Sequence, residues 1–401
     1  LEFSSTKYVR TIADTYLKGE SKPQRASASR DTIMKLPSTI SALPPLGSPE
    51  DLAMKPMQED GRALAGALTH LMRGRIDIAI DTSLCGQLVH RMTPEGYEHL
   101  KEIARYAWAT EGAVHRHVGP HCNTLLLNPR KEPIRPYNSE GEIEYGLHLI
   151  GDGAQATPGD SVPNSKSMGG YAIMFGGAAI DWKAYRLHTC TPDSTSVETM
   201  VSSRLTTRGV YHRRIAQFLG VEQTTPTWLF TDNDGTWYLA RDATSNTTMT
   251  YIIRHVRFIQ QAEYDGEIKV HQMDGTLNPA DALTKWLPSP DRKRHYLFLM
   301  GYPSEALKVW QESTKYKSYK PKKIVAQPTV TFKEPIVQSR IKEDKSYAQA
   351  VGAETFPPEG VLCVFAPWVG NPMFQESDNV RRANEAGSSA QHAAASTPDS
   401  G

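Results

Sequence analysis

The chain has 401 residues, which is long enough for two domains and a tail. It carries 45 Lys and Arg against 44 Asp and Glu, so its net charge of +1 shows no overall basicity, and any nucleic-acid binding has to come from local patches. No apolar run reaches the roughly 20 residues of a membrane-spanning helix, and there is no signal-peptide pattern. With its four cysteines widely spaced, we expect an intracellular protein, cytoplasmic or nuclear and not secreted, without a membrane partner.

Residues 1–112 predict a small helical region. Thr93 and Pro94 form a helix start, with the threonine as the N-cap and the proline at the first helical position. A single apolar stripe at helical spacing is formed by Leu64, Ala67, Leu68 and Leu71. Helices are predicted over 1–17, from 57, over 76–89 and from 94, with a proline-containing connector over 35–57.

Residues 113–144 predict an irregular connector. It contains His115, His117, His121 and Cys122, which are the residue types of a zinc site. Their spacing fits no standard zinc finger, and we favour solvated loop histidines.

Residues 145–300 predict a mixed α/β domain with five strands and flanking helices. Gly176 and Gly177 mark a turn between two of its strands. Strands are predicted over 145–152, 169–175, 178–182, 227–231 and 267–271, and helices over 194–220, 234–241, 250–261 and from 278.

Four acids occupy the ends of these elements: Asp152, Glu198, Asp232 and Asp281. Each alone has an ordinary explanation, such as a turn, a solvated helix residue, a helix cap or a partner of the helix dipole. As an ordered set, however, they match the need of a two-metal site for several carboxylates from distant segments. Their hard oxygen ligands suit Mg²⁺, with Mn²⁺ as an alternative.

Residues 145–300 resemble the ribonuclease H domain of copia-type retrotransposon Pol polyproteins. The segments that carry the resemblance are Asp152-Gly153-Ala154, Ser194–Glu198, Thr231-Asp232-Asn233 and Ala280–Lys285. Upstream, Arg75–Ala79 and His99–Tyr106 are similar to the reverse transcriptase thumb region of the same polyproteins. The resemblance covers roughly residues 1–300, and it implies a ribonuclease H-like mixed five-stranded sheet with flanking helices for residues 145–300.

The resemblance implies Mg²⁺-dependent endonucleolytic hydrolysis of the RNA strand of an RNA–DNA hybrid. Asp152 would bridge two ions, with Glu198 and Asp232 on one and Asp281 on the other; one ion would lower the pKa of the attacking water and the other would steady the departing oxygen. His271, at a predicted strand end, is a candidate for proton transfer.

Asn233 and Lys285 are further candidate nucleic-acid contacts. The resemblance also implies a partner domain, the reverse transcriptase palm and fingers upstream in the same polyprotein, and a virus-like particle as one cytoplasmic location.

The sequence departs from the family pattern at four places, one of which is a segment between Ala113 and Gly146 that is longer than usual. The polymerase motif Tyr-x-Asp-Asp is absent from this chain, Ser196 stands where the family usually has Glu, and Tyr251 stands where it has His. Two other interpretations therefore stay open. One is a decayed remnant that binds nucleic acid without cutting it, and the other is an unrelated phosphoesterase on a similar acidic scaffold.

Residues 301–401 predict a basic linker and a largely disordered tail. Lysines alternate with tyrosines in a run that either tracks a phosphate backbone or forms a solvated linker: Lys315, Lys317, Lys320, Lys322 and Lys323. Beyond about residue 387 the chain is mostly Ser, Ala, Gly and Pro, which cannot bury enough surface to fold.

Overall fold

The structure is a computed structural model that describes residues 1–24, 36, 39–117, 126–127, 133–134, 146–155, 166–241 and 250–313. The lysine–tyrosine run and the predicted disordered tail lie outside these residues, as do His121 and Cys122. Among the described helices, none combines the length and the apolar character needed to cross a lipid bilayer.

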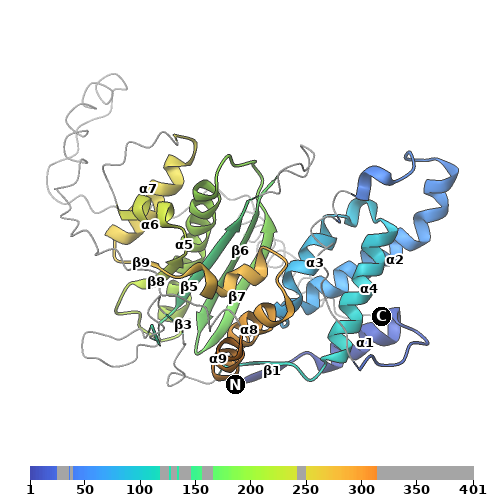
Figure 1. The fold of residues 1–401 in the computed structure, drawn as a ribbon, viewed down its shortest axis with the longest axis horizontal. Coiled ribbons are helices and arrows are strands. Elements are labelled where there is room, and N and C mark those ends of the chain that lie inside the picture. Colours follow the sequence, from blue (N-terminus) through green and yellow to red (C-terminus); the bar gives the residue numbers. More distant parts are fainter. Residues whose placement is uncertain are drawn as a thin grey trace, which may run out of the picture. The chain divides into compact units, whose positions relative to one another are not determined.

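The N-terminal region is helical, as predicted (Figure 1, blue to cyan). Thr93 caps its last helix by accepting a hydrogen bond from the Gly96 N–H at 3.0 Å. Its helices and 3-10 turns are α1 (Thr6–Tyr16), α2 (Pro49–Leu71), η2 (Ile76–Ile78), α3 (Ala79–Gly86), η3 (Val89–Arg91) and α4 (Pro94–Ala109).

The start of α2 corrects the predicted connector, because the helix begins at Pro49 and not near residue 57. Ser48 caps it, accepting a hydrogen bond from the Asp51 N–H at 3.2 Å, and proline is well tolerated at the first helical position. Pro56 lies inside the helix on its exposed side. There the carbonyl that loses its helical partner can be hydrated instead.

The N-terminus also differs from the prediction. Residues Glu2–Ser4 form a strand, β1, which pairs antiparallel with β2 (Val114–Arg116). His115 on β2 is buried, with its ring stacked on Trp182 at a centroid distance of 5.1 Å. The expectation of a solvated loop histidine is therefore wrong for His115. A second short antiparallel pair joins β3 (Leu126–Leu127) to β4 (Pro133–Ile134).

The predicted mixed five-stranded sheet is confirmed, with strand order β7-β6-β5-β8-β9. β5 and β6 pair antiparallel, as do β6 and β7, whereas β8 runs parallel to both β5 and β9. The strands are β5 (His148–Ala154), β6 (Met168–Phe175), β7 (Ala178–Arg186), β8 (Thr227–Thr231) and β9 (Ile268–Gln272).

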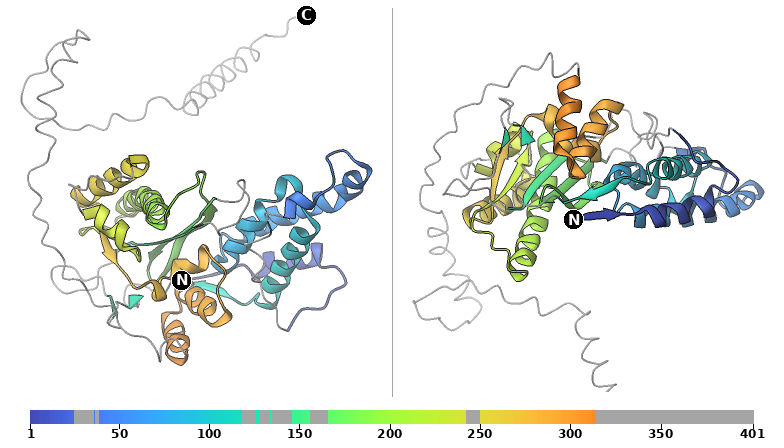
Figure 2. Two further views of the ribbon diagram at one scale, coloured as in Figure 1. Left: turned by 45° about the horizontal axis from the view of Figure 1, so that its top comes forward. Right: turned by 90° about the horizontal axis from the view of Figure 1, so that it is seen from below.

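Helices cover both faces of this sheet (Figure 2). On one face, Leu149 and Leu229 pack with Val197 of α5 (Ser194–Phe218). α6 (Asp234–Arg241) and α7 (Ile253–Tyr264) contribute to the same cluster. On the other face, Ile150 and Phe230 share a core with η7 (Pro279–Leu283), with α8 (Ser289–Leu299) and with the N-terminal helices.

The end of the described region also differs from expectation. The single helix predicted from residue 278 is divided into η7 and α8, with Pro288 directly before α8. A proline inside one continuous helix would remove a backbone hydrogen bond and clash with the preceding turn. Residues Pro303–Glu312, predicted as part of a linker, form the helix α9.

The helical region contacts the sheet through its edge strand. Trp182 on β7 donates a hydrogen bond from Nε1 to the Met72 carbonyl at 3.1 Å. Ser83 of α3 donates one to the Ala184 carbonyl at 2.8 Å. These bonds satisfy edge-strand and helix-end carbonyls that are otherwise left without partners.

A buried ion pair holds η2 against the end of α4. Arg75 and Asp77 are 1% and 3% exposed, and they form two charge-assisted hydrogen bonds of 2.8 and 2.7 Å. Tyr106 donates to the same carboxylate at 2.9 Å. Because every charge in this group is paired, its burial is tolerated.

We expect Asp77→Ala to lower the free energy of unfolding by about 3–5 kcal/mol, because it leaves the Arg75 guanidinium buried without its carboxylate. Urea denaturation measures this change. Glu98→Ala, which breaks an exposed pair with Arg105, is the control and should cost no more than about 1 kcal/mol. Equal effects of the two variants would contradict the expectation.

Candidate metal centre

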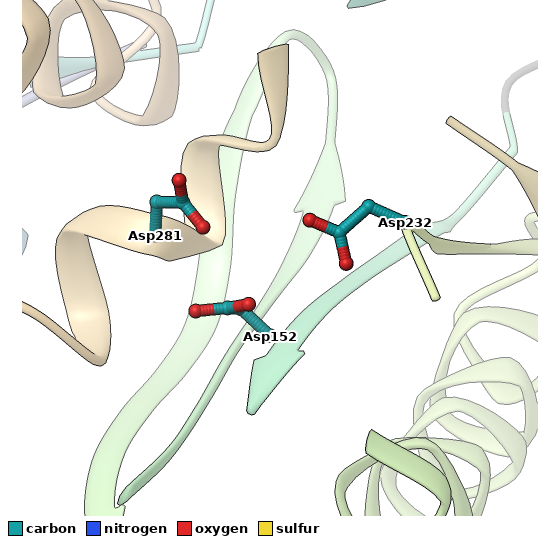
Figure 3. A group of neighbouring side chains, drawn as sticks. All are labelled: Asp152, Asp232 and Asp281. Carbon is teal, nitrogen blue, oxygen red and sulfur yellow. The ribbon is translucent and has the colours of Figure 1, made fainter. Parts of the chain in front are cut away.

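Three of the predicted acids converge in the structure. Asp152, Asp232 and Asp281 each offer a carboxylate oxygen, and these oxygens lie within 4.8 Å of one another. Figure 3 shows the three side chains turned toward a common volume from β5, from the residue after β8 and from η7. Such a convergence of carboxylates from distant segments is the arrangement that a divalent cation requires.

The sheet places two of these acids. β5 and β8 are parallel neighbours in which Ile150 is opposite Phe230. Because side chains alternate between the faces of a strand, the residues two positions further on, Asp152 and Asp232, share the face of Ile150 and Phe230. Both therefore lie at the carboxyl ends of adjacent strands, where parallel sheets commonly place their ligands.

Asn278 fixes the position of the third acid. Its side-chain amide donates to the Gly151 carbonyl of β5 at 2.9 Å, and its Oδ1 accepts from the Ala280 N–H at 3.0 Å. The first of these bonds ties η7 to the sheet and the second caps the turn that carries Asp281.

Gly170 allows η7 to approach the sheet closely. It lies opposite Asp152 on β6, and a Cβ there would stand 2.7 Å from Leu283 Cβ and 2.8 Å from Thr284 Cγ2. Any larger residue would therefore push η7, and Asp281 with it, away from β5.

Glu198 approaches from the opposite face on α5. Its Oε1 accepts a hydrogen bond from the Gly153 N–H at 3.0 Å. A Cβ on Gly153 would lie 2.6 Å from Val197 Cγ1 and 3.1 Å from the Glu198 nitrogen, so glycine is needed for this contact as well. Glu198 is not among the three acids whose oxygens meet within 4.8 Å, but it borders them.

Burial and mutual repulsion raise the proton affinity of these acids. Burial, followed by the charges of Asp152 and Asp232, raises the pKa of Glu198 well above its usual range. Burial and Asp152 raise the pKa of Asp232 to about 6 and that of Asp281 to about 8. Raised carboxyl pKa values in one cluster indicate that a positive charge would be bound favourably there.

Part of that positive charge comes from Lys285. Its ammonium lies 2.8 Å from Asp281 Oδ1 and 3.7 Å from Asp152 Oδ2. The Thr284 hydroxyl also donates a hydrogen bond to Asp152. Lys285 thus neutralises part of the negative charge of these oxygens. The same oxygens are the hard ligands that Mg²⁺ or Mn²⁺ prefers. The residues therefore fit a divalent metal.

Two other candidates have local roles. Asn233 caps α6, since its Oδ1 accepts from the Thr236 N–H at 2.9 Å and from the Thr195 hydroxyl at 3.2 Å. Lys285, a candidate nucleic-acid contact, pairs with Asp281 and Asp152.

His271 is not brought to the acids. Its ring packs against Trp228 with 4.4 Å between centroids, and burial, followed by Arg241 and Lys269, lowers its pKa to about 3. None of the four acids is among the charged groups acting on it in the described part of the chain. This environment holds the imidazole neutral.

Two of the departures from the family pattern, Ser196 and Tyr251, touch each other. Their hydroxyls lie within hydrogen-bond distance of one another and at 2.6 and 2.8 Å from Asp193 Oδ2. Because each hydroxyl has one proton, at most two of these three contacts are hydrogen bonds at any time. Asp193 is the N-cap of α5 and accepts from the Ser196 N–H at 2.8 Å. The Ser and Tyr thus form one local network at the start of the helix that carries Glu198.

Sequence reasoning did not identify Thr284 or Asn278 as part of the site. An Asn before Pro279 is a recognisable helix-start signal, but its bond to Gly151 joins segments far apart in the chain. The Ser196–Tyr251 contact has no local signal, because α5 and the segment before α7 are brought together only by folding.

Curated proteins provide sequence relatives. The chain is 25% identical over 224 residues to the "Retrovirus-related Pol polyprotein from transposon RE1" of Arabidopsis thaliana, which covers 56% of this chain and 14% of that protein. The corresponding polyprotein from transposon TNT 1-94 of Nicotiana tabacum is 27% identical over 215 residues, or 53% and 14%. The chain thus spans about one seventh of the length of these relatives.

Family models and solved structures give weaker similarities than the curated proteins do. No family model matches the chain. Among solved structures, the N-terminal RNase H domain of a Mycobacterium tuberculosis protein, fused to maltose-binding protein, aligns with 35% of this chain and 91% of its own. Its sequence identity is 11% and its TM-score 0.26. Over somewhat more than half its length, the chain is related to the retrovirus-related Pol polyproteins of copia-type transposons.

Proposed function

We propose that this chain is the ribonuclease H portion of a retrotransposon polyprotein and hydrolyses the RNA strand of RNA–DNA hybrids with two Mg²⁺ ions. The observation that carries the proposal is the meeting of Asp152, Asp232 and Asp281 oxygens within 4.8 Å. The relationship to Pol polyproteins supports a nucleic-acid substrate. The same carboxylates could also hold Mn²⁺.

The residues divide the task by position. The charge of Asp152 raises the pKa of both other aspartates, so Asp152 would contact both ions, with Asp232 and Glu198 serving one and Asp281 the other. The metal, when bound, makes a bound water more acidic and neutralises charge on the departing oxygen. Thr284 orients the Asp152 carboxylate, and Lys285 balances the cluster's negative charge. Selectivity for RNA would come from a hydrogen bond to the 2′-hydroxyl, from Glu198 or nearby backbone.

We also propose partners from the relationship. A reverse transcriptase palm and fingers would stand upstream in the same polyprotein, since the N-terminal helices resemble its thumb region. The protein would then act inside the cell, in a cytoplasmic virus-like particle or in the nucleus.

A decayed element that binds hybrids without cutting them is the second candidate. The Ser196 and Tyr251 departures favour it, because they alter the first turn of the helix carrying Glu198. Three of the four acids, however, converge, and the two substituted residues share one hydrogen-bond network with Asp193, which supports a site that keeps its geometry.

Cleavage of a labelled hybrid separates these candidates. We expect Mg²⁺-dependent cleavage by the wild type and a loss of about 100-fold or more in Asp232→Asn, because a carboxylate that would hold one of the charge-stabilising ions is removed. Asp234→Asn, two residues away at the start of α6, is the matched control and should cleave normally. Binding without cleavage by the wild type would favour the decayed element.

The raised pKa values predict how stability depends on pH. The folded state binds protons more tightly than the unfolded chain does, since the pKa of Asp232 is raised from 3.8 to about 6 and that of Asp281 from 3.8 to about 8. Their contribution is therefore fully present below about pH 4 and is lost as the pH rises through these values. Metal-free protein should thus lose stability from about pH 4 to pH 8.

Thermal unfolding at several pH values tests this dependence. We expect a shallower loss in Asp281→Asn, which removes one of the repelling charges, than in the Asp234→Asn control. Mg²⁺ at 100 times its dissociation constant should restore about 2.7 kcal/mol to the wild type at pH 8. Identical pH profiles of the two variants, or no effect of Mg²⁺, would refute the proposed metal centre.

A further inference from the structure

Basic side chains gather where α5 passes the edge strand β7. Along β7, Asp181, Lys183 and Tyr185 are two residues apart and so share one face of the strand. Arg204 and Arg208 are four residues apart on α5 and so lie on one side of that helix. We call Lys183, Arg204 and Arg208 the basic cluster.

Direct contacts bring the two rows together. The Arg204 guanidinium lies 4.3 Å from the centre of the Tyr185 ring. Arg208 donates to Asp181 Oδ2 at 2.7 and 3.0 Å. The strand and helix faces therefore oppose each other along their length, with the basic groups between them.

The basic cluster has more positive charge than it can neutralise. In the part of the chain that the structure describes, its only ion pair is the one from Arg208 to Asp181. Three cations thus face one carboxylate. The pKa of Lys183 reflects this excess of positive charge, because it is lowered by burial and then by the charges of Arg204 and Arg208. Lys183 is nonetheless an exposed side chain, accessible to a ligand.

The cluster lies beside the metal centre but is separate from it. Ala184, next to Lys183, is opposite Gly170, which is opposite Asp152. Two strand spacings of about 4.8 Å each put this row roughly 10 Å from Asp152. Lys183 faces α5, whereas Asp152 faces the opposite side of the sheet with Ile150.

We propose that the basic cluster binds the phosphate backbone of a nucleic acid and forms a second contact for the substrate of the metal centre. This inference rests on the proposed function for its choice of ligand. Arg204 and Arg208 are about 6 Å apart along the helix, and Lys183 on the strand adds a third cation, a spread of charge that suits a polyanion better than one small anion. Arginine also matches phosphate with paired hydrogen bonds.

Two features favour nucleic acid over an acidic peptide. Tyr211 is 54% exposed, and the Arg208 guanidinium lies 5.2 Å from its ring centre, so an aromatic surface for stacking adjoins the cations. The chain's net charge is only +1, so its affinity for a polyanion has to come from a local excess of this kind.

The test is binding of a labelled RNA–DNA hybrid to the full chain in EDTA, where no metal-dependent cleavage occurs, at several salt concentrations. The double variant Lys183→Met and Arg204→Met keeps the aliphatic stems that cover Tyr185. We expect its affinity to fall and the slope of log K against log salt to become shallower by about two, roughly 0.9 per lost phosphate contact.

A matched pair provides the control. Lys269 on β9, the opposite edge strand of the sheet, and Arg254 on α7 are both exposed. Their double methionine variant removes the same charge and should keep the wild-type slope. Thermal unfolding checks that each variant folds. If the double variant does not fold, Lys183→Met alone should lower the slope by about one.

The outcomes separate this inference from the proposed function. Hybrid binding that falls in the Lys183 and Arg204 variant supports it, even if the wild type never cleaves. A wild-type slope in that variant, or no hybrid binding by the wild type, overturns it. A loss of polyglutamate binding with unchanged hybrid binding also overturns it, because the ligand would then be an acidic peptide.

Discussion

Repulsion among Asp152, Asp232 and Asp281 is the interaction that the surrounding structure has to overcome. Three carboxylates with oxygens within 4.8 Å of one another would separate or take up protons if packing did not hold them. The pKa of Asp281, raised to about 8 by burial and by Asp152, reflects this repulsion. Lys285 relieves part of it from within the chain, and a divalent ion would relieve more.

Close packing of backbone segments supplies the opposing constraint. Gly153 lets α5 bring Glu198 to the end of β5, and Gly170 lets η7 lie on β6. Asn278 then joins η7 to β5 by a hydrogen bond to Gly151. The acids are thus carried by elements that cannot move apart without breaking buried contacts. The same helix also positions the basic cluster, since α5 carries Glu198 near its start and Arg204 and Arg208 further along.

Most helices and strands were predictable because their signals are local. Thr93-Pro94 marks a helix start within two residues, and a run of β-branched and aromatic residues marks β8 within five. The failures occur where a distant partner decides. Glu2–Ser4 becomes a strand because Val114–Arg116 pairs with it, and His115 is buried because Trp182 covers it. Val114–Arg116 and Trp182 are both far in sequence from the segments that they contact, so no local sequence pattern predicts these contacts.

The sequence by itself determined which residues are available for chemistry and in what order: four acids at the ends of elements, with motifs that relate the chain to Pol polyproteins. The tertiary structure decided which of them meet. In the structure, three aspartates converge and Lys285 forms an ion pair with one of them. His271 packs against Trp228, and Ser196 contacts Tyr251. The reason is physical, since residue type and spacing control structure over a few residues, whereas contacts between distant segments depend on how whole faces of helices and strands pack.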